Sequence, residues 1–358
     1  MTTEVLPDSP DPATAEASPP RGTLPAGSWR SAIRRAGHGF MRHRGVDAAA
    51  ALTFFTALAA FPFSLALVSA FALFDDRDRA VNDLVAVADT VLPDNASVDI
   101  ERGLRELLSL DNPLLALLIG LAILLWTVSG YATAFGRAMN TIYEVEEGRP
   151  FWKFRGRMLL VAAVLVTLAT GIVTILLTTP NATSDILGRR GLAPVVAIVW
   201  DVAKWPVLVV LLGLLIAVLF YFSPNVRHTR LRWVSIGSLA AIALWAVATI
   251  GFALYITIAG HYDTLYGSLG GIITAVLWSY LGNAALIMGA ELDAEFVRLR
   301  QLARGEAAEE NVRLPLRDTS RNHVLARQRD VDVAAARRIR SAVNDAAGAE
   351  TLSPDRPE

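Results

Sequence analysis

Long runs of hydrophobic residues alternate along this chain with polar segments that carry most of the charges. Crossing the hydrocarbon core of a bilayer takes about 20 apolar residues at ~1.5 Å of rise each. Six runs reach that length, which predicts six transmembrane helices and an all-α, polytopic membrane fold. These runs cover about residues 46–74, 114–134, 158–179, 205–222, 234–259 and 267–292.

Arginine and lysine are unevenly divided between the two sides of the predicted bundle. The segment before residue 46, the loops after the second and fourth spans, and the tail after residue 292 are basic. By contrast, the loop at 75–113 has four arginines against ten acids. Because loops rich in Lys and Arg remain in the cytoplasm, we expect both termini to be cytoplasmic.

The segments outside the spans differ in composition. Residues 1–28 are polar and rich in proline, which predicts a disordered leader. Within 75–113, hydrophobic residues recur at helical spacing, which predicts amphipathic helices in this first outer loop. Residues 29–300 then form the six-helix membrane domain, and residues 301–358 form a flexible or marginally helical tail rich in arginine and alanine.

Composition and motifs limit the chemistry that this chain can perform. The 358 residues are 53% hydrophobic and include no cysteine, which excludes disulfides and thiol chemistry. The five histidines are scattered, and the sequence has no zinc-protease, nucleophile-elbow or ATP-binding motif. We therefore expect no enzyme activity, no catalytic residue, no metal or other cofactor and no nucleic-acid partner.

The first predicted span carries a stripe of small and hydroxyl side chains. Thr53, Thr56, Ala57, Ala60 and Ser64 share one face at helical spacing. Small and hydroxyl residues collect where helices touch in lipid, so the stripe has a packing interpretation. In the alternative interpretation the stripe faces a substrate path, with Thr53, Thr56 and Ser64 as path residues.

The sixth predicted span carries glycines on one face, which predicts close contact with a neighbouring helix. These helix-packing glycines are Gly267, Gly270, Gly271, Gly282 and Gly289. Tyr280, Asn283 and Glu291 lie on nearly the opposite side and are candidates for a substrate path. Glu291 is either an interfacial acid at the cytoplasmic end of the helix or a gating or proton-coupled carboxylate.

Acidic residues cluster at the end of the sixth span. Glu291 and Asp293 point about 200 degrees apart on a helix, which disfavours a carboxylate metal site made from this pair. Glu295 shares the face of Glu291, and we expect it to lie in water.

The segment between the second and third spans is expected at the cytoplasmic surface. Aromatic and basic residues alternate over residues 151–157, which predicts an interfacial belt whose partners are membrane lipids with anionic headgroups. Arg137 and Asn140 share a helical face, where the guanidinium can hold a carboxylate or phosphate. The alternative for Arg137 is snorkelling toward the headgroups. The sequence leaves a homo-oligomer open.

Four stretches carry a resemblance to a known family: AAALTFFTALAAFPF (49–63), AMNTIYEVEEGRPFWKFR (138–155), FSPNVRHTRLRWVSIGSLAAIALW (222–245) and YGSLGGIITAVLWSYLGNAALIMGAELDAE (266–295). As an ordered set they resemble the YihY/virulence factor BrkB family of bacterial inner-membrane proteins. The resemblance implies six membrane helices and a location in the bacterial plasma membrane.

The resemblance implies several activities. Members have carried a ribonuclease BN label, others are linked to envelope integrity, and some are suspected of moving lipids or small solutes. No active site is shared across the family, so no catalytic residue carries over. Our leading hypothesis is a transporter or lipid translocase acting in envelope homeostasis. The alternatives are a non-transporting scaffold for envelope assembly and, third, a membrane-bound ribonuclease.

Overall fold

The computed structural model describes residues 27–73, 112–177, 193–227, 235–259 and 269–351. Regular structure in these ranges consists of eight helices. The predicted leader up to residue 26, the amphipathic helices expected in the first outer loop, and Gly267 lie outside the described residues.

Six of the described helices are long and apolar enough to cross a membrane, which confirms the predicted polytopic all-α fold. They are α2 (Gly45–Ala72), α5 (Pro113–Ile142), α6 (Phe151–Leu177), α8 (Ala193–Phe222), α9 (Ile236–Ala259) and α11 (Leu269–Leu302). Two of them, α6 and α8, begin earlier than predicted, at residues 151 and 193. Two others continue well beyond the predicted C-terminal ends, α5 past residue 134 and α11 past residue 292. The added turns carry charges but pack on the protein: Phe135 and Met139 of α5 are fully buried.

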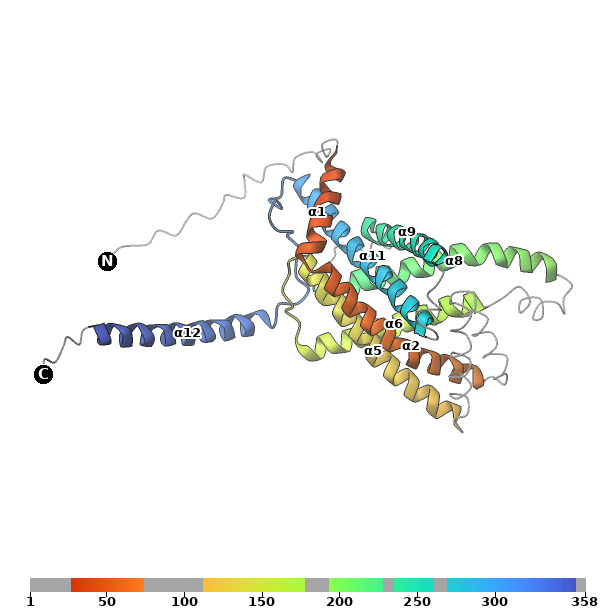
Figure 1. Cartoon of the computed structure of the whole chain (residues 1–358), viewed down its shortest axis with the longest axis horizontal. Coiled ribbons are helices and arrows are strands. Elements are labelled where there is room, and N and C mark those ends of the chain that lie inside the picture. Colours follow the sequence, from red (N-terminus) through yellow and green to blue (C-terminus); the bar gives the residue numbers. More distant parts are fainter. Residues whose placement is uncertain (1–26, 74–111, 178–192, 228–234, 260–268, 352–358) are drawn as a thin grey trace, which may run out of the picture.

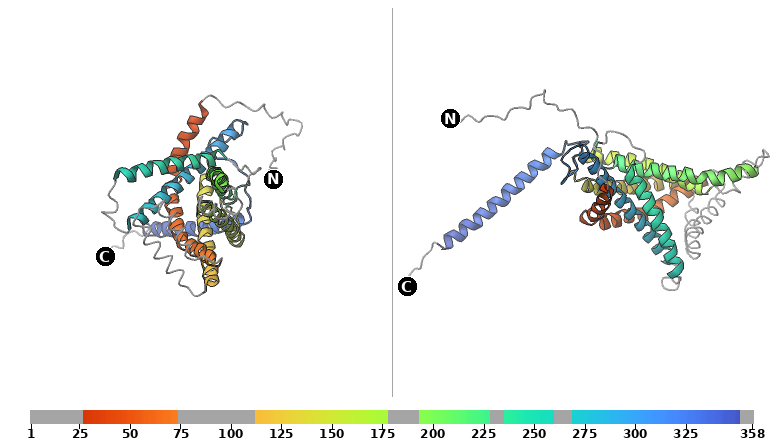
Figure 2. Two further views of the ribbon diagram at one scale, coloured as in Figure 1. Left: turned by 90° about the vertical axis from the view of Figure 1, so that its right-hand side faces the viewer. Right: turned by 90° about the horizontal axis from the view of Figure 1, so that it is seen from above.

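The six spans pack side by side in the order α9, α11, α2, α5, α6 and α8, and a smaller contact between α8 and α9 joins the two ends of this row (Figure 1, Figure 2). A buried cluster that includes Phe135, Met139 and Met158 fills the space between them. Large apolar side chains such as Phe54, Leu160 and Val247 remain exposed on the outside. This inside-out distribution suits helices whose outer faces contact lipid.

Helices α9 and α11 approach closely at glycines. A Cβ atom on Gly289 would lie 2.6 Å from the carbonyl oxygen of Gly237 and 2.6 Å from the Cβ of Ala241. A Cβ atom on Gly282 would lie 3.0 Å from Nε1 of Trp245. Gly282 and Gly289 therefore lie at a close helix contact. The buried members of the predicted set are Gly270, Gly271 and Gly289.

Helix α1 (Ser28–Arg42) precedes the first span and has no counterpart among the predicted elements. Its buried residues, Ala32, Ala36, Gly39 and Phe40, form one face that packs on the end of α11. Gly39 is required for this contact, because a Cβ atom there would lie 2.6 Å from Oε2 of Glu291. The small size of three of the four buried side chains explains why hydropathy does not reveal this helix.

The sequence predicts a flexible or marginally helical tail after α11, and the structure has an irregular segment there followed by a helix. Residues 303–318 return across the end of the bundle, where Ala308 and Val312 are buried and Leu316 forms a β-bridge with Val226. Helix α12 (Asn322–Thr351) then extends away from the other helices (Figure 1), with most of its described side chains exposed. Side chains of the membrane helices bind the carbonyl groups of the irregular segment at 303–318, as described below, and hold it against the bundle.

Candidate functional site

A polar cluster joins α2, α5 and α11 inside the membrane-spanning bundle. The Tyr131 hydroxyl donates a hydrogen bond to Oδ1 of Asn283 at 2.9 Å. Nδ2 of Asn283 donates in turn to Oγ1 of Thr53 at 3.2 Å and lies 3.4 Å from Oγ1 of Thr56. Polar groups at this depth need protein partners, because lipid offers none. The predicted path residues Thr53 and Asn283 thus bind each other across the contact between α2 and α11.

A cavity of about 400 Å³ lies beside this cluster, between α2, α5, α6 and α8. Its walls are mostly apolar and include Phe55, Leu165 and Leu215. Its polar groups come from Thr56 and Tyr131, which also belong to the cluster. Ligand sites are typically concave, mostly apolar and ~300–1,000 Å³ in volume, so this cavity can receive a hydrocarbon chain or another apolar group.

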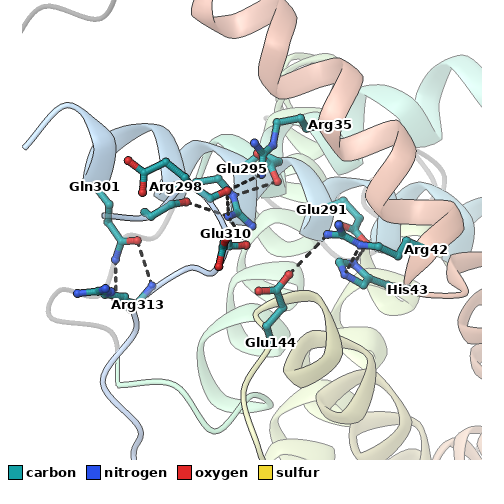
Figure 3. Close-up of polar contacts among 12 residues, drawn as sticks. Arg35, Arg42, His43, Glu144, Glu291, Glu295, Arg298, Gln301, Glu310 and Arg313 are labelled. Carbon is teal, nitrogen blue, oxygen red and sulfur yellow. Dashed lines mark hydrogen bonds and ion pairs between the residues drawn. The ribbon is translucent and has the colours of Figure 1, made fainter. Parts of the chain in front are cut away.

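Two buried carboxylates tie α1 to the end of α11 (Figure 3). Oε1 of Glu291 lies 2.8 Å from Nδ1 of His43, and the two side chains are 3% and 11% exposed. Oε2 of Glu295 lies 3.1 Å from Nε of Arg35, and its other oxygen lies 3.3 Å from Nε of Arg298. The expectation that Glu295 lies in water is therefore wrong, because α1 and the following segment cover this end of α11.

Arg298 and Gln301 hold the returning segment against the bundle (Figure 3). Nη1 of Arg298 donates to the carbonyl groups of Ala308 at 2.9 Å and Glu310 at 3.0 Å. The Gln301 amide donates to the carbonyl of Arg313 at 2.5 Å and accepts from its N–H at 3.2 Å. These bonds replace the main-chain partners that an irregular segment otherwise takes from water.

Asn140 joins the loop after α5 to the end of α8. Its oxygen accepts from the N–H of Asn225 at 2.8 Å, and its Nδ2 donates to Oε2 of Glu147 at 2.8 Å. The Asn225 side chain binds both the carbonyl and the N–H of Asp318, so the same link includes the returning segment. Arg137 is exposed and forms no ion pair with a described residue. The two residues predicted to share a site are therefore not brought together.

Asp293 has partners of its own. The Tyr143 hydroxyl donates to Oδ2 of Asp293 at 2.9 Å, and the N–H of Gly237 lies 3.4 Å from Oδ1. Burial, followed by the charge and hydrogen bond of Asp293, raises the pKa of Tyr143 well above its usual value. Glu291 and Asp293 thus serve different neighbours, in agreement with their opposite directions on the helix. Within the described ranges, no three His, Cys, Asp or Glu side chains gather where they could hold a metal ion.

The remaining predicted path residues lie apart from the cluster. Ser64 donates to the carbonyl of Ala60 in its own helix at 2.9 Å. Tyr280 is half-buried and has no hydrogen-bond partner among the described residues. Two residues that the sequence did not single out, Tyr131 and His43, make the central contacts instead. The sequence signal that could have indicated Tyr131 is its polar hydroxyl within the second apolar run.

Comparisons with known proteins agree on one family. The sequence pattern of the virulence factor BrkB family matches residues 36–315. The ribonuclease-like protein YfkH of Bacillus subtilis is 28% identical over 268 residues, which is 73% of this chain and 93% of that protein. UPF0761 membrane proteins of Laribacter hongkongensis and Chromohalobacter salexigens are 28% and 31% identical, over 71% and 75% of this chain. The alignments span only 58% and 62% of those two proteins. No solved structure matches the chain.

Proposed function

This chain belongs to the virulence factor BrkB family, and we propose that it is a transporter or lipid translocase of the bacterial plasma membrane that acts in envelope homeostasis. The observation that carries the proposal is the open cavity of about 400 Å³ that four membrane helices line. A wall that is apolar except for Thr56 and Tyr131 suits the hydrocarbon chain of a lipid. We propose that both termini are cytoplasmic, and the basic segments of the sequence support this orientation.

The cavity also suggests where the path lies. The contact between α2 and α11 is occupied by the bond between Thr53 and Asn283. The adjoining side of α2 lines the cavity with Phe55, Thr56 and Phe63, and Thr56 belongs to both sides. We therefore place the path between α2, α5, α6 and α8, with Asn283 as the residue that orients Tyr131 and Thr56 at its edge. The sequence has no ATP-binding motif, so transport is passive, driven by a gradient or powered by a partner.

We favour transport over RNA cleavage because the prominent acids of the described residues are already engaged. Glu291 faces His43, Asp293 faces Tyr143, and Glu295 faces two arginines. Nucleases that use metal ions need several carboxylates directed at one point, and these three point toward different partners. Membrane lipids are accordingly the partners that we propose.

Purified protein in liposomes tests this function with fluorescent phospholipids and a panel of small solutes. Ala169→Phe fills the cavity from α6, whereas Ala246→Phe adds the same bulk to an exposed position of α9. We expect movement of at least one substrate above that in empty vesicles, lost in Ala169→Phe and retained in Ala246→Phe. Folded protein that moves none of them contradicts the proposal, and stable co-purifying partners without flux would support a scaffold instead.

A further inference from the structure

Two arginines from separate segments meet at the end of α8, and the charge of a third acts on one of them. Nη2 of Arg149, in the loop before α6, donates to the carbonyl of Ser223 at 2.9 Å. Nη2 of Arg317, in the returning segment, donates to the carbonyl of Tyr221 at 3.0 Å. Arg157 of α6 is near enough for its charge to act on Arg317. Two guanidinium groups are thus anchored on neighbouring carbonyls, each by one of its nitrogens.

One nitrogen of each group has no protein partner among the described residues, although Nε and Nη2 of Arg149 also bind Glu147. Nη1 of Arg149 and Nη1 of Arg317 are buried and form no hydrogen bond with a described residue. The same is true of Oγ of Ser223, whose residue is completely buried. The whole Arg149 side chain is only 3% exposed. Buried donors are nearly always satisfied, and an unsatisfied one destabilises the folded protein, so these atoms indicate a ligand with several acceptors.

The local charges also favour an anion. Glu147 forms a two-pronged pair with Arg149, and the nearest lysine, Lys153, lies 4.0 Å from Asp318. Arg157 and Arg317 form no ion pair with a described carboxylate. Burial and the like charges of Arg157 and Arg149 lower the pKa of Arg317 to about 10. Arg317 is therefore still charged at neutral pH and is repelled by Arg149 and Arg157. An anion bound beside these arginines would neutralise this excess of positive charge.

We infer that Arg149 and Arg317, together with the Ser223 hydroxyl, bind a phosphate group, and that the charge of Arg157 adds to the attraction. A phosphate offers three acceptor oxygens and matches the fork of a guanidinium group better than a single acceptor does. The site lies beside the start of α6, where Trp152 is 83% exposed, as expected of the headgroup region of a membrane. A lipid headgroup and free phosphate share this chemistry.

A lipid whose phosphate is bound at this site would lie one turn of α8 away from the cavity. The N–H of Ser223 donates to the carbonyl of Leu219 at 3.1 Å, and Leu219 lines the cavity. A phospholipid held by its phosphate at this site can direct a chain toward the cavity. Only this link to the cavity rests on the proposed transport function, because the binding site itself requires no transport.

Binding to the delipidated full-length protein tests the site. Native mass spectrometry measures retention of phosphatidylglycerol and of diacylglycerol, which has the same chains but no phosphate, and calorimetry measures inorganic phosphate. We expect phosphatidylglycerol to be retained at least tenfold more than diacylglycerol by the wild type. That preference falls about tenfold or more in Arg157→Gln and Arg317→Gln. It is retained in Arg34→Gln, which removes an exposed arginine of α1.

The outcomes separate the two sources. Selective retention of phosphatidylglycerol supports a lipid site, and binding of inorganic phosphate without lipid preference supports a site for free phosphate. If the wild type binds neither, or binds either one equally well after both arginines are replaced, the inference is overturned. The wild-type comparison of the two lipids still decides if a variant fails to fold. Selective binding without flux would contradict the proposed function alone, and flux without selective binding would contradict this site alone.

Discussion

Nδ1 of His43 lies 2.8 Å from Oε1 of Glu291, although 248 positions separate the two residues in the chain. The pair fastens α1, which lies before the first span, to the end of the last span. Because Gly39 leaves room for the carboxylate, the contact is buried rather than superficial. The end of the bundle is therefore closed by side chains from the two extremes of the membrane domain.

Replacing Glu291 tests the strength of this closure. Removing one partner of a buried hydrogen-bonded pair leaves the other unsatisfied and costs about 1–3 kcal/mol. We expect Glu291→Ala to lower the unfolding temperature strongly in detergent, and Glu291→Gln to lower it less, because an amide oxygen still accepts a hydrogen bond. Glu306→Gln is the control, since the 3.7 Å pair of Glu306 with Arg304 is exposed and contributes little. A Glu291→Ala protein as stable as the wild type would refute the closure.

The cluster within the membrane predicts energetic coupling between Tyr131 and Asn283. A double-mutant cycle with Tyr131→Phe and Asn283→Ala isolates the 2.9 Å hydrogen bond between them. We expect a coupling free energy of about 0.5–1.5 kcal/mol in denaturant-induced unfolding, the range for such bonds between membrane helices. Tyr131→Phe combined with Thr257→Val should be additive, because Thr257 is bonded only within α9. Additivity in both cycles would count against the cluster.

Hydropathy was sufficient to predict the membrane spans, because each span must cross the same thickness of hydrocarbon. It was not sufficient to predict their ends. Residues 135–142 of α5 and 293–302 of α11 carry charges, yet they continue as helix because protein packs around them. Helical spacing correctly separated the directions of Glu291 and Asp293, since that depends only on the geometry of one helix.

Contacts between distant segments were beyond the reach of the sequence. Nothing near Glu291 indicates His43, because their meeting depends on how α1 folds across α11. The returning segment at 303–318 has no hydrophobic period, and it is held by bonds from Arg298 and Gln301 to main-chain groups. Such bonds leave no repeating pattern of side chains. Arg149 and Arg317 likewise bind main-chain carbonyl groups, so the sequence does not reveal that they meet at the end of α8.

The glycine contact of α11 predicts a difference between two glycines. A Cβ atom on Gly289 would lie 2.6 Å from a carbonyl oxygen of α9, whereas one on Gly171 of α6 would have no neighbour within 4 Å. We expect Gly289→Ala to destabilise the protein by about 1–3 kcal/mol through overpacking. Gly171→Ala should be neutral or slightly stabilising because alanine favours helix. Thermal unfolding in detergent measures both, and equal stabilities would contradict the close contact of α9 and α11.

The buried hydroxyl of Tyr143 predicts a loss of stability in alkaline solution. Its pKa is raised by burial and by the neighbouring Asp293, whereas in the unfolded chain a tyrosine loses its proton near pH ~10. Above that pH the unfolded state binds fewer protons than the folded state, so the stabilisation by the neutral hydroxyl is present below it and declines as the pH rises.

Tyr143→Phe should be about 1 kcal/mol less stable at neutral pH, because Asp293 loses a donor. Its unfolding temperature should then fall less steeply than that of the wild type above pH ~10. Parallel curves for Tyr143→Phe and the wild type would show that Tyr143 does not keep its proton in the folded protein.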